Sequence, residues 1–236
     1  MERFRKFAVL AGLLLLLAVC LSACAGGNIK NSGFLGDPAA YAKLEPSTRA
    51  LDQIWLDPTV DFKKYHKIML DEVVFYLKDD AQNKAIDPSE IKELADAFKQ
   101  AFIKELSSSY PLVAAPGPDV LRVKVAIVDI EPSNRALDTI TTVLPVGIAV
   151  SLVKQGAGGS GTGVGSASME VQFIDSESGK VIGMGKDTQA GSKLDMAAKV
   201  DEWGHAKSAF AYWAKSLKTG LDDIAAGKFK AEQKKE

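Results

Sequence analysis

Residues 166–186 read SASMEVQFIDSESGKVIGMGK, and this stretch decides the fold. In its first half, every second position from residue 167 to residue 173 is apolar: Ala167, Met169, Val171 and Phe173. Such alternation is typical of a β-strand with one face in the core, so Ser168, Glu170 and Gln172 are expected to point outward. Ser176-Glu177-Ser178-Gly179 follows as a turn, and residues 180–186 are expected to return as the second strand of a hairpin.

Two more strands are predicted upstream of this hairpin. Residues 121–130 alternate, with Leu121, Val123, Val125 and Ile127 on one face. Arg122 and Lys124 are on the other face before Ala126, Val128 and Ile130 take over. Residues 68–77 are apolar at nearly every position, which predicts one strand buried on both sides. Its two faces are expected to carry Ile68, Leu70, Val74 and Tyr76, and Met69, Val73, Phe75 and Leu77.

Two amphipathic helices complete the pattern. Asp87-Pro88-Ser89-Glu90 has an N-cap residue, a proline at the first helical position and a glutamate at the third, which predicts a helix from residue 88 to about residue 108. The second helix is expected over residues 201–226, closed by Gly227. Its apolar stripe consists of Trp203, Ala206, Phe210, Trp213, Leu217, Leu221 and Ile224. The order of elements predicts an α+β fold, a mainly antiparallel sheet covered on one face by two amphipathic helices.

The aromatic stripe of the last helix has two interpretations. Trp203, Phe210 and Trp213 at this spacing are typical of a helix that packs on a sheet. A coiled-coil surface for a partner is the alternative, disfavoured by the size of the rings at the seam positions.

The N-terminus has the three parts of a secretory signal peptide. Arg3, Arg5 and Lys6 give a positive region, residues 7–20 are apolar or small, and Leu21-Ser22-Ala23-Cys24 follows. The apolar run is shorter than the roughly 20 residues of a spanning helix. Leu-Ser-Ala-Cys resembles the lipobox of bacterial lipoproteins, which implies cleavage before Cys24 and lipid attached to its sulfur. The alternative is an ordinary signal peptide cleaved after Ala23.

The predicted chain organisation follows from that cleavage. Residues 1–23 are the signal peptide, and residues 24–45 are the lipidated cysteine and a Gly- and Ala-containing tether of which the more apolar part docks. Residues 46–227 are expected to form a single α+β domain facing the periplasm, and residues 228–236 a charged tail. Ala25 after the cysteine resembles the outer-membrane sorting pattern of proteobacteria.

Composition bounds the size of the core and gives no indication of nucleic-acid binding or of an internal disulfide. Of the 236 residues, 213 remain after cleavage, enough for one sizeable core. They carry 26 basic and 29 acidic residues, so the net charge of −3 gives no basic surplus for nucleic acid. Cys20 leaves with the signal peptide and Cys24 carries the lipid, so no disulfide is expected within the mature chain.

Several segments together resemble a family of bacterial lipoproteins known as a domain of unknown function, number thirty-three thirteen. The matching pieces are Ser32-Gly33-Phe34-Leu35, Tyr65, the stretch from Gly161 through Met169-Glu170-Val171 to Val181, and Trp203 with the later Phe210, Tyr212, Trp213, Ala214 and Leu217. The resemblance covers nearly the whole mature chain, although Gly36-Asp37-Pro38-Ala39-Ala40-Tyr41 is a looser version of the family's tether pattern. It implies a lipid-anchored, periplasm-facing domain and no reaction.

No motif predicts a cofactor, a metal or a catalytic residue. Residues 156–161 match the glycine pattern of dinucleotide-binding loops, but a strand is expected after them where that loop needs a helix. His66, expected at a strand edge, and His205, expected on the last helix beside Trp203, are too few for a structural zinc site without free cysteines. The acidic pairs Asp79-Asp80 and Asp222-Asp223 are interpreted as solvated positions.

Residues 137–153 are the most apolar stretch after the signal peptide. Pro145 and Gly147 interrupt their near-helical spacing, which favours a broken helix packed against the domain. A second contact with the membrane is the alternative.

The sequence thus predicts a lipid-anchored envelope lipoprotein on the periplasmic side of the outer membrane. Its partners are expected to be the membrane, through lipid on Cys24, and an envelope protein or cell-wall polymer that it binds or scaffolds without catalysis. A hydrolase of cell-wall polymer, whose carboxylates meet only in the fold, and an accessory lipoprotein of an envelope transport system are the alternatives.

Overall fold

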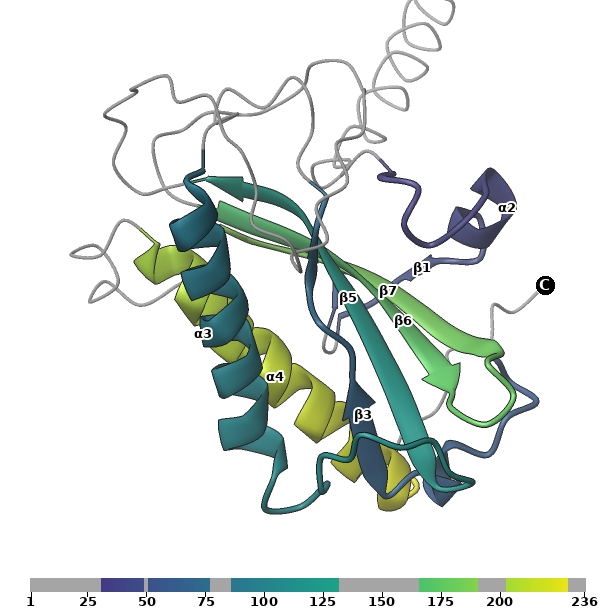
Figure 1. Cartoon of the computed structure of the whole chain (residues 1–236). Coiled ribbons are helices and arrows are strands. Elements are labelled where there is room, and N and C mark those ends of the chain that lie inside the picture. Colours follow the sequence, from purple (N-terminus) through teal and green to yellow (C-terminus); the bar gives the residue numbers. More distant parts are fainter. Residues whose placement is uncertain (1–30, 49–50, 77–85, 132–165, 191–202, 229–236) are drawn as a thin grey trace, which may run out of the picture. The chain divides into compact units, whose positions relative to one another are not determined.

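The computed structural model describes residues 31–48, 51–76, 86–131, 166–190 and 203–228. Seven strands form one mixed, mostly antiparallel sheet, and two long helices pack together on one of its faces (Figure 1). A short helix, α2 (Pro38–Tyr41), lies on the other side of the sheet (Figure 1). This arrangement confirms the predicted α+β fold.

The predicted hairpin occupies the middle of the sheet. Strand β6 spans Ser166–Asp175 and pairs antiparallel with β7, Val181–Ala190, so that Glu170 stands opposite Lys186. On the other side of β6 lies β5, Val120–Glu131, also antiparallel. The strand order is β1-β2-β7-β6-β5-β3, with β4 also paired to β5.

Beyond β7 the sheet continues with two strands that the sequence analysis did not predict. They are β2, Gln53–Leu56, which pairs with β7, and β1, Glu45–Pro46, which pairs with β2. All four side chains of β2 are half-buried, so its sequence lacks the alternation by which a strand is recognised.

The single strand predicted over residues 68–77 is corrected by the structure to two short strands, β3 (Lys67–Leu70) and β4 (Val74–Phe75). Both run parallel to β5, but the chain uses four residues from Leu70 to Val74 where β5 uses three, from Val123 to Ala126. One extra residue reverses which side chains face the core. Ile68 is therefore buried together with Val73 and Phe75, which the alternation had placed on the opposite face.

Asp71 occupies the irregularity between β3 and β4. Its carboxylate accepts two hydrogen bonds from the Arg122 guanidinium, each 2.8 Å long, and its backbone N–H donates to the carbonyl of Val123. This planar two-bond pairing explains why the strand breaks where it does.

The two helices form as predicted. Helix α3, Pro88–Leu106, begins with a capping box, in which Asp87 accepts from Ser89 and Glu90 accepts from the Asp87 backbone N–H. Helix α4, Gly204–Ala225, ends before Gly227, whose φ of 68° suits a glycine. No described helix combines the length and the apolarity that are needed to cross a membrane.

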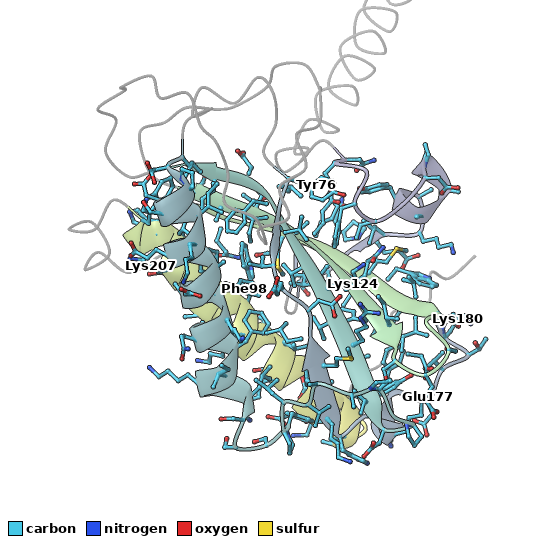
Figure 2. All side chains as sticks on the ribbon, in the orientation of Figure 1. Tyr76, Phe98, Lys124, Glu177, Lys180 and Lys207 are labelled. Carbon is cyan, nitrogen blue, oxygen red and sulfur yellow. The ribbon has the colours of Figure 1, made fainter. Side chains whose placement is uncertain are left out.

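The main core lies between these helices and the sheet. Phe98 of α3, labelled in Figure 2, contacts Phe210 of α4 edge-on, with 5.5 Å between ring centroids. Trp213 follows one turn later on α4 and is only 1% exposed. The interpretation of the stripe as a packing surface is therefore confirmed for its aromatic residues.

Replacing Trp213 with alanine is expected to lower the free energy of unfolding by roughly 3–5 kcal/mol, because a large buried ring is lost. Chemical denaturation of the domain measures this loss. The neighbouring Tyr212, 38% exposed, is the control, and Tyr212→Ala is expected to cost far less. Equal midpoints for Trp213→Ala and the parent would contradict the burial of this ring.

Candidate functional site

The sheet face opposite the helices carries a buried ion pair. Glu170 of β6 is fully buried and Lys186 of β7 is 3% exposed, with 4.0 Å between the nearest nitrogen and oxygen atoms. Glu170 is on the outward face, as predicted, but it is covered. Burying two charges is unfavourable unless further hydrogen bonds satisfy them, so this face requires polar partners.

Residues 31–44, the N-terminal segment, supply those partners. The hydroxyl and backbone N–H of Ser32 donate to the Glu170 carboxylate at 2.6 and 3.2 Å, and the Tyr41 hydroxyl donates to it at 2.7 Å. Lys186 donates to the side-chain oxygen of Asn31 at 2.9 Å, and its ammonium lies 5.4 Å from the centre of the Tyr41 ring. The N-terminal segment is thus held to the middle of the sheet by charge-assisted hydrogen bonds.

The sequence of the N-terminal segment suits this path. Gly33 and Gly36 have φ angles of 92° and 123°, which favour glycine, and the Asp37 side chain accepts from the Ala40 N–H at the start of α2. The Tyr41 hydroxyl oxygen accepts from the backbone of Gly33 at 2.8 Å. Burial of this phenol, with the adjacent Glu170, raises the pKa of Tyr41, so the hydroxyl keeps its proton for Glu170.

A small apolar cluster reinforces the attachment. Leu35 and Tyr41 are buried against Met184 of β7, with Trp55 of β2 packed alongside. The ring of Phe34 meets Tyr76, labelled in Figure 2, edge-on at 5.6 Å. Part of the predicted tether therefore packs as a layer on the sheet.

A second polar cluster surrounds Asp175 at the end of β6. Its carboxylate accepts from the ammonium of Lys64 at 2.8 Å, from the hydroxyl of Tyr65 at 2.7 Å, and from the backbone N–H and hydroxyl of Ser178 in the turn. The bond from Lys64 contributes most to holding the pKa of Asp175 well below its usual range. Burial and the same carboxylate raise the pKa of Tyr65 to about 12.

Another buried carboxylate, Asp187 of β7, lies on the helix-facing side. It accepts from the indole N–H of Trp213 at 2.7 Å, from the Gln189 amide, and from the backbone N–H of Asp52 at 3.0 Å. Burial raises the pKa of Asp187. Because Glu170 and Asp187 lie on opposite faces, these two carboxylates do not face each other across a cleft.

An apolar pocket of about 70 Å³ lies between the sheet and the C-terminal half of α4. Its floor consists of buried side chains of the central strands and Trp213, and its rim of half-buried residues from β2, from the 3₁₀ helix η1 (Phe62–Lys64) and from α4. The rim residues are Ile54, Leu56, Phe62, Ser216, Leu217, Gly220 and Ile224.

Two glycines of β7 make room for leucine side chains that line this pocket. A Cβ atom on Gly185 would lie 2.4 Å from Cδ1 of Leu51, and one on Gly183 would lie 2.6 Å from Cδ2 of Leu56. Both distances are below any real carbon–carbon contact, so the two leucines occupy space that side chains of β7 would otherwise fill.

Several residues singled out in the sequence lie outside the described ranges. They are Cys24, the acidic pair Asp79-Asp80, the apolar stretch 137–153 and the glycine run 156–161. Lipidation of Cys24 stays a prediction.

The two histidines differ in solvent exposure. His66 is exposed just before β3, whereas His205 on α4 is 2% exposed and its Nδ1 has no hydrogen-bond partner among the described residues. Within the part of the chain that the structure describes, no three His, Cys, Asp or Glu side chains come close enough to hold a metal ion. Asp222 accepts from Lys218 and Tyr110 at the surface.

The N-terminal attachment is tested by Tyr41→Phe, which removes one donor to Glu170 and leaves the ring in place. The free energy of unfolding is expected to fall by about 1.5–3 kcal/mol, the range for hydrogen bonds to charged groups. Hydrogen exchange of residues 31–44 is expected to become faster in Tyr41→Phe than in the parent chain. Asp37→Ala, which removes only the α2 cap, is the control and is expected to leave Ser32 protected. Unchanged exchange at Ser32 and Gly33 in Tyr41→Phe would contradict the proposed role of the bond.

The Asp175 cluster predicts a pH-dependent contribution to stability. The pKa of Asp175 in the folded state is below its ordinary value of 3.8, so its contribution is present above that value and is lost as the pH falls through the folded pKa. Asp175→Asn is therefore expected to be less stable than the parent at neutral pH, and the difference is expected to shrink in acid. Urea denaturation between neutral and acidic pH measures it. A difference that grows in acid would show that the sign is wrong.

A family model and a bacterial lipoprotein match this chain. The model of the family described as "protein of unknown function (DUF3313)" matches residues 30–217. The uncharacterized lipoprotein YdcL of Escherichia coli (strain K12) is 28% identical over 161 residues, which are 66% of this chain and 68% of YdcL.

Similar solved structures are more distant. The PelC dodecamer of Paraburkholderia phytofirmans is 11% identical, with 69% of this chain and 95% of that chain covered and a TM-score of 0.35. A Xanthomonas campestris protein of the DUF330 family model is 10% identical, with 77% and 97% covered and a TM-score of 0.37. The family match includes Glu170, Asp175 and most of α4. The chain therefore belongs to the DUF3313 family.

Proposed function

We propose that this chain is a lipoprotein anchored by lipid on Cys24 and that its domain is a non-enzymatic binding or scaffolding module on the periplasmic side of the outer membrane. The lipobox at residues 21–24 and the similarity to the lipoprotein YdcL support the anchor. The signal peptide ends at residue 23, and the domain extends to about residue 227 before the charged tail.

The observation that carries the proposal is the attachment of the N-terminal segment. Ser32 and Tyr41 bind Glu170, so the chain from Asn31 onward belongs to the folded domain. These residues therefore do not lengthen the tether. Six residues lie between Cys24 and Asn31, and the seven steps of chain from one to the other span at most about 25 Å when fully extended. A domain on such a tether works close to the membrane surface.

A short tether favours a partner that is also at that surface. Confining two binding partners to one layer raises their effective concentration without any new contact between them. An envelope protein or the cell-wall polymer near the membrane fits this geometry.

The positions of the buried carboxylates support binding over hydrolysis. A glycosidase pair needs two carboxyl groups that face each other across the scissile bond. Glu170 and Asp187 lie on opposite faces of the sheet, and each is already bonded to neighbouring side chains.

The anchor is tested in intact cells with Cys24→Ser, which removes the thiol that accepts the lipid. The variant is expected to remain an uncut precursor or to be released from membranes by carbonate, without lipid labelling. Normal lipid labelling of Cys24→Ser would overturn the anchor.

The short tether is tested by inserting a flexible Gly/Ser spacer of about 20 residues after Gly27, since such a spacer behaves as a random coil. Crosslinking in intact cells is expected to give fewer adducts with the spacer, while lipid labelling is unchanged. The same spacer inserted after Lys228, at the other end of the domain, is the matched control and is expected to leave the adducts unchanged. Equal adducts in all three chains would contradict the role of the short tether.

A further inference from the structure

A glycine, Gly220, lies on the face of α4 that lines the pocket, next to Leu221 of the apolar stripe. Positions 206, 210, 213, 217, 220 and 224 follow one another at alternating steps of four and three, the spacing that keeps side chains on one face of a helix. All of them carry apolar side chains except position 220, which is glycine. Nothing lies within 4 Å of the place that a Cβ atom on Gly220 would take.

A glycine inside a long helix is unfavourable unless it serves packing or function. Gly220 has an ordinary helical backbone, and no neighbour demands the missing side chain. Close packing therefore does not explain Gly220, whereas keeping the pocket open does.

The size and lining of the pocket define the class of ligand. Its 70 Å³ is room for roughly five water-sized molecules, which is also the scale of a short stretch of alkyl chain. Of the lining residues only Ser216 has a polar side chain, so water gains little there. A flexible hydrocarbon chain fits such a lining better than a polar ligand does.

A lysine, Lys63, neighbours the pocket lining in the sequence and the end of α4 in space. Lys63 directly follows Phe62 of the lining, is exposed, and forms no ion pair with another described residue. Its ammonium lies 3.5 Å from the place of a Cβ atom on Gly227, just past the end of α4. A ligand whose alkyl chain enters beside Phe62 would have an anionic head group within reach of Lys63.

We propose that the pocket between α4 and the sheet binds a fatty acid, with part of its hydrocarbon chain in the open space beside Gly220 and its carboxylate at Lys63. This site does not depend on the anchor at Cys24, since every residue of the site lies between Leu51 and Ile224.

The test uses the mature chain beginning after Cys24, which retains every contact of the compact unit that starts at Asn31. The fluorescent fatty acid cis-parinaric acid is titrated into the protein and then displaced by dodecanoate. Saturable fluorescence and displacement are expected. Gly220→Leu, which places a side chain in open space, is expected to weaken binding by at least about tenfold.

Controls separate filling of the pocket from damage to the fold. Ala211→Leu adds a similar side chain to an exposed position of the same helix and is expected to leave the affinity unchanged. Gly220→Ala adds a single carbon and is expected to raise the unfolding midpoint, because alanine favours helix, while it weakens binding less than leucine does. Saturable binding that Gly220→Leu and Gly220→Ala both leave unchanged would overturn the site, and so would the absence of saturable binding.

The head group is tested with Lys63→Gln. Affinity for dodecanoate is expected to fall, while affinity for dodecanol, which has the same chain and no charge, stays the same. An unchanged affinity for dodecanoate, or stronger displacement by dodecylphosphocholine than by dodecanoate, would overturn the assignment to a fatty acid.

Discussion

The central hairpin of β6 and β7 is buried on both faces, and this constraint organises the rest of the domain. Helices α3 and α4 cover one face, and the N-terminal segment covers the other. A buried charge needs a partner within the domain because water is excluded. Glu170 and Lys186 therefore bind residues 31–41, and Asp187 binds the indole of Trp213 on the opposite face. Two sets of hydrogen bonds thus tie the covering layers to the same pair of strands.

Several segments that carry the family resemblance prove to be partners in space. Ser32 of the Ser-Gly-Phe-Leu piece binds Glu170, which lies 138 residues further along the chain. Tyr65 binds Asp175 at the start of the turn, 110 residues away. Contacts of this kind are structural, because each joins one covering segment to the end or the middle of a central strand. These two pieces of the family signature therefore help to hold the segments that pack against the sheet.

The sequence predicted the elements whose signals are local. The capping residues of α3, the period of α4 and the alternation of β6 each depend on neighbours within a few positions. It missed β2, whose side chains are all half-buried, and the irregularity at Asp71, which depends on Arg122 some fifty residues away. The polar partners of Glu170 were missed for the same reason: alternation shows that a side chain points away from the helices and does not show what covers it.

Glycines offered a signal that alternation alone does not use. Gly183 and Gly185 occupy positions of β7 that face the helices, where a large apolar side chain is the usual choice. Leu51 and Leu56 fill that space from the neighbouring part of the sheet. Gly220 is different, because nothing from another element fills the space beside it. A glycine whose vacant volume is occupied serves packing, whereas one whose volume stays open lowers helix stability without compensation inside the domain. Within one pocket, Leu51 and Leu56 fill the space beside the glycines of β7 and form part of the lining, whereas the space beside Gly220 stays open.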